Sequence, residues 1–550
     1  MFPGCIHGLV RFARNGFPSH SSLARPCLGV DSTAQAGAVA RERRRVHSII
    51  VHHIITACAL LLVVSAARAK KFNLWIEVRS PHFVVVSNAG EKAARRSAIQ
   101  FEQIRAVFLT VLANGKSRAT TPTITVLALK NEASLRSLIP QYWKGYHARP
   151  AGIFSHRLGQ FYIALDLSAP GPNPNSTIYH EYFHALSTRY APDLPAWLAE
   201  GLADFYGNTQ IGTREANIGL PDEVSVAELK RATPLPLAML FEINHASPYY
   251  NVRGKALLFH AEAWAVTDYL MLADGGAHRK SLFEYISDAK QGATSPAAAR
   301  TDFGDLNKLQ TRVLEYMRGL PLDHMRAAAP GAVADSDLSV QAISDVDADA
   351  YRGGFLAIQG QPRRAIPLLE HAVADNPTSK LADRNLALAF LLAGRRKEAI
   401  TVATRAIAAD PHDAMTRYIR AYCSFHGTML QSNPEMEGDL RAAIATAPAF
   451  APPYAFLSAY LAAQGTHLDD AYVYARRAVS LNPNNSMYQL TLAKVLGRMS
   501  RYAESHAAAL RARRYASDTS DQHAADLFLE FLTQQTANSH EAQLTSSSRP

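Results

Sequence analysis

Two histidines and a glutamate form the segment of this chain that is best suited to chemistry. His180, Glu181 and His184 follow the pattern His-Glu-x-x-His. Residues four apart project from the same face of a helix, so both imidazoles can bind one metal ion, and Asn175 or Ser176 suits the N-cap of that helix. Glu181 lies beside this face and can reach a metal-bound water as a general base. The segment predicts a metal-dependent hydrolase.

A catalytic zinc ion takes three protein ligands and keeps one position open, so a third ligand is needed. The metzincin pattern would place it six residues after His184, where the chain has Tyr190. The other expected arrangement uses a glutamate on a following helix, and Pro195–Gly207 supplies both Glu200 and Asp204 on one helical face. We expect Glu200 to bind the metal and Asp204 to accept the free N–H of a ligating histidine.

Together these segments resemble the gluzincin branch of the zinc peptidases, and specifically the peptidase MA-like group. The residues that carry the resemblance are His180-Glu181-Tyr182-Phe183-His184 and Pro195-Ala196-Trp197-Leu198-Ala199-Glu200-Gly201. The resemblance covers residues 72–320 and implies a zincin-like fold. It also implies that Zn²⁺ is bound by His180, His184 and Glu200, with Glu181 as the base and Asp204 behind the ligands.

The same family tends to have an aromatic-Tyr-x-x-Ser-Trp helix further along the chain. Here the corresponding segment is Phe259–Trp264, with His260 at the position of the tyrosine and an alanine at that of the serine. We expect His260 to stabilise the oxyanion of the transition state through an N–H. Tyr249, Tyr250 and Arg253 compete for this role.

The elements that must position these residues follow from the hydrophobic pattern. Ahead of the metal-binding motif the pattern predicts a small α/β unit, and from Asn175 onward it is almost wholly helical. In gluzincins the strand before the active-site helix borders the cleft, and Gln160–Leu165 occupies that place; an exposed edge could pair with a peptide substrate. The expected elements are a strand over Trp75–Asn88, a helix to Leu112, a strand over Thr123–Leu129, a helix over Glu132–Tyr142 and a hairpin over Ala151–Leu167.

A repeat of about 34 residues occupies the C-terminal part of the chain. Pro377, Pro411, Pro448 and Pro483 each follow an alanine-rich amphipathic helix, and Gly360 and Gly394 are also spaced by one repeat. A helix-turn-helix unit of this length with a closing proline is typical of the tetratricopeptide repeat, and stacked units of this kind offer a concave surface to a protein partner.

The start of the chain has the order of a secretory signal. The basic segment Arg41–Arg45 precedes an apolar run, 49–64, and a small-x-small site ends at Ala69. We expect cleavage after Ala69 and a periplasmic or secreted protein; the alternative is a membrane anchor formed by residues 49–64. The formal charge of +10 does not indicate a nucleic-acid partner, because residues 1–69 hold eight arginines and the remainder carries 49 basic and 45 acidic residues.

The expected architecture is an α+β zincin-like metallopeptidase domain followed by an all-α tetratricopeptide-repeat solenoid. The expected divisions are an N-terminal extension and signal peptide (1–69), the peptidase domain (70–325), a linker (326–345), the solenoid (346–535) and a disordered tail (536–550).

Three functions remain open on the sequence. The first is an exported zinc metallopeptidase whose repeats recruit a protein. The second is a non-catalytic interaction protein that carries a decayed peptidase fold. The third is a zinc-dependent hydrolase of a substrate other than a peptide, such as a cell-wall amide.

Overall fold

The structure of the chain is a computed structural model. It describes residues 74–112, 123–143, 150–170, 173–191, 194–244, 247–290, 296–319, 321–331, 333–425, 433–465, 467–516 and 519–547. The predicted signal peptide and extension (1–69) and the alternative anchor (49–64) lie outside these ranges. Among the helices that fall within them, none is both long and apolar enough to cross a membrane.

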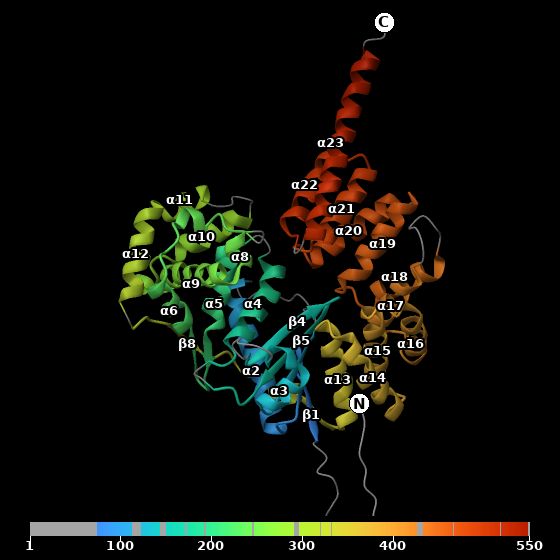
Figure 1. Cartoon of the computed structure of the whole chain (residues 1–550), viewed down its shortest axis with the longest axis horizontal. Helices are drawn as coiled ribbons and strands as arrows, with labels where there is room; N and C mark the ends of the chain where they lie inside the picture. The colour runs from blue at the N-terminus through green and yellow to red at the C-terminus, as the bar shows by residue number, and fades with distance from the viewer. Residues whose placement is uncertain are drawn as a thin grey trace, which may run out of the picture. The chain divides into compact units, whose positions relative to one another are not determined.

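A six-stranded mixed sheet organises the first half of the described chain (Figure 1). Its strands in spatial order are β4 (Gly152–Arg157), β5 (Gln160–Asp166), β3 (Ile124–Leu129), β2 (Phe83–Ser87), β1 (Trp75–Arg79) and β9 (Ser339–Ile343). The central strands β2, β3 and β5 are parallel. The strand β4 lies at one edge, antiparallel to β5, while β1 and β9 complete the other side with antiparallel pairing.

The structure divides the strand that was predicted over Trp75–Asn88 into β1 and β2. The two pair antiparallel, and the turn between them contains Pro81, which has no N–H to donate to a ladder. The N–H of Ser80 donates to the carbonyl of Phe83 and closes the turn. The expectation of a single strand was therefore wrong.

Both faces of the sheet are covered. On β2, Val85 belongs to an apolar cluster with residues of α2 (Glu91–Leu112) and α4 (Ser176–Tyr190). Its neighbours Val84 and Val86 point the other way, into a cluster with α13 (Asp345–Ile358) and further helices of the repeats. The run of consecutive apolar residues on β2 is typical of a strand that is buried on both sides.

The remaining helices and strands that precede α13 in the sequence complete the surroundings of α4. The helix α5 packs between α4 and α9, and β6, β7 and β8 form a small antiparallel sheet. The elements are α3 (Glu132–Leu138), η1 (Pro140–Trp143), α5 (Ala196–Gly207), β6 (Thr209–Ile211), β7 (Glu215–Ile218), α6 (Glu223–Arg231), α7 (Leu237–Leu240), α8 (Pro248–Asn251), α9 (Arg253–Gly276), α10 (Arg279–Lys290), α11 (Ala297–Phe303), α12 (Leu306–Arg318), β8 (Met325–Ala328) and η2 (Asp335–Asp337).

The segment predicted as a linker, 326–345, is largely paired to the first part of the chain. β8 pairs with β7, and β9 pairs with β1 across the whole length of both strands. The buried carboxylate of Glu77 on β1 favours the pairing of β9 with β1, because it is only 3% exposed and needs hydrogen-bond donors. Gln341 of β9 and Tyr351 of α13 both donate to it. The linker expectation was wrong, because the partners of this segment lie far away in the sequence.

Five helical hairpins follow within the described residues. The glycines that recur after the first helix, Gly360 and Gly394, have φ of +75° and +76°, a backbone that favours glycine. Each of the four recurring prolines lies in the turn after a second helix. The pairs are α13 with α14 (Pro362–Asp375), α15 (Lys380–Leu392) with α16 (Arg396–Ala409), α17 (Ala414–Ser424) with α18 (Pro434–Thr446), α19 (Ala451–Gln464) with α20 (Leu468–Leu481), and α21 (Ser486–Arg498) with α22 (Tyr502–Arg514).

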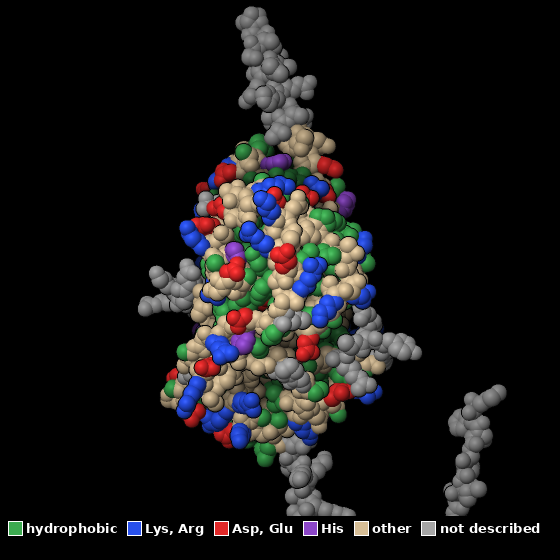
Figure 2. Space-filling view, turned by 90° about the vertical axis from the view of Figure 1, so that its left-hand side faces the viewer, with side chains coloured by type: hydrophobic (Ala, Val, Ile, Leu, Met, Phe, Trp, Pro, Cys, Tyr) green, Lys and Arg blue, Asp and Glu red, His purple; other side chains and the backbone are tan. Residues whose placement is uncertain are grey.

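A last helix, α23 (Thr519–Ser547), packs against α21 and α22 and continues through most of the tail that was expected to be disordered (536–550). Its sequence contains alanine, glutamine, glutamate and leucine, which favour a helix despite their low combined hydrophobicity. On the face of the molecule drawn in Figure 2, lysines and arginines are interspersed with aspartates and glutamates.

Candidate metal centre

The two histidines of the motif project from one face of α4. Their Nε2 atoms are 3.0 Å apart, and the rings meet edge to face with centroids 4.6 Å apart. Asn175 occupies the cap position ahead of α4, but its side chain makes no capping hydrogen bond and instead bonds the hydroxyl of Tyr179. The large aromatic residues on the opposite side of α4 are buried against α2 and the sheet, which leaves the histidine face toward α5.

Glu200 joins the two histidines from α5. Its Oε2 lies 3.1 Å from Nε2 of His184 and 3.3 Å from Nε2 of His180, so the three donor atoms form a nearly equilateral triangle. The side chain of Glu200 is only 4% exposed, whereas those of His180 and His184 are 15% and 28% exposed. The three predicted metal ligands therefore converge, with two of them partly open to solvent.

The dimensions of this triangle fit zinc. With zinc–ligand distances of about 2.0–2.1 Å, the donor atoms of a tetrahedral site lie about 3.3 Å apart. Two imidazole nitrogens and one carboxylate oxygen are also a donor set that zinc takes in catalytic sites. His180, His184 and Glu200 could thus hold a zinc ion with a fourth position left open.

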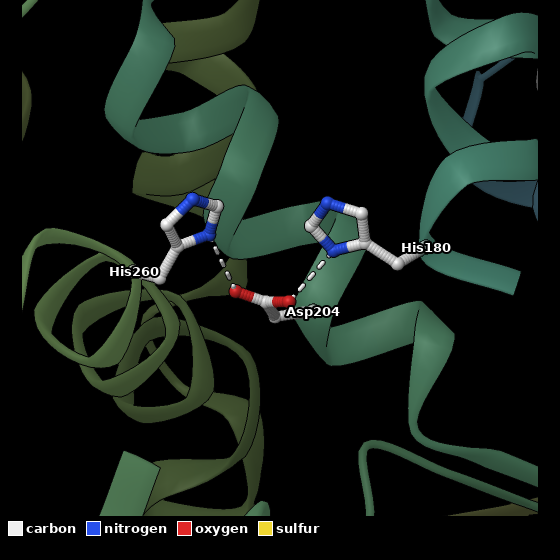
Figure 3. Close-up of side chains that lie close together, drawn as sticks. All are labelled: His180, Asp204 and His260. Carbon is white, nitrogen blue, oxygen red and sulfur yellow. Dashed lines mark hydrogen bonds and ion pairs between the residues drawn. The ribbon is translucent and has the colours of Figure 1, made fainter. Parts of the chain in front are cut away.

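Asp204 lies one turn after Glu200 and links two histidines (Figure 3). Its Oδ1 accepts a hydrogen bond of 2.6 Å from Nδ1 of His180, on the side of the ring away from the metal triangle. Its Oδ2 lies 3.4 Å from Nδ1 of His260 on α9. Asp204 thereby fixes the tautomer of His180 that leaves Nε2 available to a metal.

Tyr250 on the short helix α8 also reaches the centre. Its hydroxyl donates a hydrogen bond of 2.6 Å to Oε1 of Glu200, the oxygen that does not face the histidines. His260 is tied to Asp204 and lies 3.6 Å from Oε2 of Glu200. Both Tyr250 and His260 therefore border the centre, while Arg253 has a side chain outside the described part of the structure.

Charge keeps the carboxylates of the centre ionised. Burial alone would raise the pKa of Glu200, but the adjacent imidazoles of His184 and His180 outweigh it and hold the pKa well below its usual value. The pKa of Asp204 is likewise lowered, because His180 outweighs the effect of burial. Burial and the negative charge of Glu200 raise the pKa of Tyr250, so its hydroxyl stays protonated and remains a donor.

Two glycines let α5 approach its neighbours. A Cβ on Gly201 would lie 2.2 Å from Oγ1 of Thr267 and 2.4 Å from the carbonyl oxygen of Ala263, so α5 and α9 touch directly beside Glu200. A Cβ on Gly207 would lie 3.2 Å from the backbone nitrogen of His180. These contacts set how far Glu200 extends toward the histidines.

The edge of the sheet next to α4 is β4, whereas the sequence placed Gln160–Leu165 at the border of the cleft. That segment forms β5, which is paired on both sides. The correction follows from the hairpin, which turns the chain back so that β4 becomes the outer strand. His156 of β4 is exposed, its ring is stacked on Phe161, and it lies within electrostatic range of the exposed Glu181.

Sequence reasoning named all five residues that the structure brings together here: His180, His184, Glu200, Asp204 and His260. The sequence offered Tyr250 only as a competitor of His260 for the oxyanion, and its contact with Glu200 was not predicted. No spacing rule reveals that contact, because a loop and a short helix separate the two residues. The position of His156 near Glu181 was not predicted either.

Comparisons with known proteins identify the second part of the chain. The tetratricopeptide repeat family model matches residues 356–421. One similar solved structure is TTC0263, a thermophilic TPR protein of Thermus thermophilus, with 18% identity, covering 34% of this chain and 99% of that chain at a TM-score of 0.28. A second is MamA of Desulfovibrio magneticus RS-1, with 17% identity, covering 31% of this chain and 96% of that chain at a TM-score of 0.27. A third is pilF of Pseudomonas aeruginosa, with 19% identity, covering 37% of this chain and 91% of that chain at a TM-score of 0.29. A search of curated proteins found no match. The family match and the five helical hairpins show that this part is a helical solenoid of tetratricopeptide type.

Proposed function

We propose that this protein is a zinc-dependent metallopeptidase of the gluzincin type, in a zincin-like fold with tetratricopeptide repeats attached. The observation that carries the proposal is the triangle formed by the Nε2 atoms of His180 and His184 and by Oε2 of Glu200, with sides of 3.0–3.3 Å. The hydrogen bond from His180 to Asp204 supports it, because ligating histidines commonly donate their other N–H to a carboxylate.

Each residue around the triangle would have a separate role in amide hydrolysis. Bound zinc would supply Lewis acidity and lower the pKa of a coordinated water toward neutrality. Glu181, which is exposed beside the histidine face, accepts the proton of the attacking water and passes it to the leaving nitrogen. His260 borders the centre from α9 and can donate to the oxyanion of the tetrahedral intermediate, whereas the single O–H of Tyr250 is donated to Glu200.

A peptide is the substrate class that the sheet favours. β4 is an edge strand antiparallel to β5, so an extended peptide could add to it as a further strand. The exposed His156 on that strand would lie beside such a peptide. The secretory signal predicted before Ala69 would place the enzyme in the periplasm or outside the cell.

Substitution of the base tests catalysis separately from metal binding. We expect Glu181→Gln to retain zinc, because Glu181 is not one of the three ligands, and to lose at least about 100-fold in kcat on any cleaved peptide. The wild-type protein with bound zinc should be assayed against a mixed peptide library in parallel. Equal activity of the two proteins would contradict the proposal.

The repeats support a second function, protein recruitment, with or without catalysis. The family match over residues 356–421 favours it, because stacked repeats of this kind present an extended surface to protein ligands. If the wild-type protein holds zinc and cleaves no peptide, while the repeats still capture a protein, a non-catalytic interaction protein becomes the better description.

A further inference from the structure

The tip of the β4–β5 hairpin has an unusual residue in its turn. The loop consists of Leu158 and Gly159, between the paired residues Arg157 and Gln160. Both have positive φ, 49° and 72°, as in a type I′ turn, where Asn and Gly are the usual residues. A leucine is strained in this backbone. Its side chain is half-buried against the apolar cluster shared by the sheet and the repeats, and this contact compensates for the strain.

The second residue of the turn lies directly against a repeat. A Cβ on Gly159 would lie 3.1 Å from Cε2 of Phe450, which caps the start of α19. The ring of Phe450 in turn packs edge-on against Tyr418 of α17, with centroids 5.6 Å apart. The tip of the hairpin is therefore seated on the third and fourth helical pairs.

Further contacts hold the body of the hairpin. Gln359, at the end of α13, donates a hydrogen bond to the hydroxyl of Ser155 on β4. The hydroxyl of Tyr162 on β5 lies 3.5 Å from Nδ2 of Asn385 on α15. A Cβ on Gly354 of α13 would lie 2.3 Å from the same tyrosine hydroxyl, so only glycine allows this approach. Contacts from several repeat helices thus line one face of the hairpin.

The other face of the hairpin lies against the helix that carries the histidines. Phe154 of β4 packs into the cluster that includes residues of α4. A Cβ on Gly152 would lie 2.7 Å from Cδ1 of Ile178, which is two residues before His180. The hairpin is consequently enclosed between α4 and the repeats, and β4 retains an outer edge.

We propose that the repeats act as a positioning element for peptide binding, in which Phe450 and Gln359 hold β4 at the distance from α4 that an added peptide strand requires. This inference rests on the proposed peptidase function. It assigns to the repeat residues that contact the hairpin a ligand within the same chain, the β4–β5 hairpin. Phe450 and Gln359 are positioning residues, since they act through the hairpin and do not touch the substrate.

The test compares the full-length Phe450→Ala variant with a matched control, Phe528→Ala. Phe528 is also a partly buried aromatic residue of the helical part, and it packs near Gly497 and against Phe531. We expect hydrogen exchange of the hairpin amides to become about tenfold faster in Phe450→Ala and to stay unchanged in the control. We also expect KM for a peptide substrate to rise about fivefold or more, with kcat within about twofold and the zinc content unchanged.

The milder variant Gln359→Ala should change exchange and KM in the same direction, and it keeps the test decisive if Phe450→Ala fails to fold. Unchanged exchange and KM in the folded variants would overturn the positioning role and leave the proposed peptidase intact. Failure of the wild-type protein to cleave any peptide would instead overturn the proposed function, and with it the binding of peptide to β4.

Discussion

In the proposed metal centre, the carboxylate of Asp204 and the phenol of Tyr250 are expected to affect how firmly a metal ion is held. Asp204 orients His180, while Tyr250 binds the oxygen of Glu200 that faces away from the histidines. Groups that orient metal ligands in this way typically change metal affinity by about 10–100-fold when they are removed. The residues behind the ligands therefore offer a test of the metal centre that does not depend on finding a substrate.

We predict that Tyr250→Phe weakens zinc binding by about tenfold, because Oε1 of Glu200 loses a hydrogen bond and its orientation is less fixed. Competition with a chelator of known affinity measures this. Tyr249→Phe is the matched control, since Tyr249 is the neighbouring tyrosine and its ring contacts Lys255. Equal zinc affinity in the two variants would show that the Tyr250 contact does not support the ligand.

A second residue-scale prediction concerns the buried Asp268 on α9. Burial raises its pKa from 3.8 to about 7, and it accepts a hydrogen bond from Tyr316. The folded state then binds more protons than the unfolded state between about pH 4 and 7, so this group lowers the free energy of unfolding as the pH rises through that range. We expect Asp268→Asn to raise the thermal midpoint at pH 8 relative to the wild-type protein and to reduce the difference between pH 5 and pH 8. Asp469→Asn on the surface should leave that difference unchanged, and an unchanged difference in Asp268→Asn would contradict the assignment.

The helix α5 carries Glu200, the third proposed metal ligand, and lies in close contact with α9. We predict that Gly201→Ala moves α5 away from α9, because the added Cβ would overlap Thr267 and the backbone at Ala263. The expected result is a loss of zinc affinity of about tenfold or more, together with destabilisation of about 1–3 kcal/mol. In contrast, Gly254→Ala on α9 has open space around its Cβ and should be neutral or stabilising. Calorimetry and zinc titration measure both effects, and retention of full zinc affinity in Gly201→Ala would argue against this packing constraint.

Local regularity explains which elements the sequence could predict. Helical spacing placed His180 with His184 and Glu200 with Asp204, and the proline and glycine spacing located the repeats. Pairing between distant segments has no local signal: β9 joins β1 over more than 250 residues, so the segment 326–345 resembled a linker. For the same reason, the sequence did not predict the contact of Tyr250 with Glu200 or the edge position of β4. Both depend on the path of the loops that connect the elements.

At the scale of the whole molecule, the first repeat helix completes the core of the sheet. Val84 and Val86 on β2 are buried in a cluster that includes α13 and further repeat helices. Trp75 of β1 donates a hydrogen bond to Asp345 at the start of α13, and Tyr351 bonds the buried Glu77. The sheet and the repeats therefore share a hydrophobic cluster and are joined by hydrogen bonds, of which the bond from Tyr351 to Glu77 is buried.

We predict that a chain ending at residue 344 is insoluble or aggregates, because removal of α13 exposes one apolar face of the sheet. A chain ending at residue 535 should remain soluble and keep its zinc affinity. Size-exclusion chromatography with light scattering distinguishes the two. A monomeric, zinc-binding fragment that ends at residue 344 would show that the first part folds independently of the repeats.

The central claim is that His180, His184 and Glu200 hold one zinc ion. The most direct measurement is elemental analysis of purified residues 70–550 beside a Glu200→Ala variant whose circular dichroism matches the wild-type protein. We expect close to one zinc per wild-type chain and a large loss of zinc in the variant. Wild-type protein that contains no zinc after growth in zinc-replete medium would contradict it, as would a variant that retains zinc at the wild-type level.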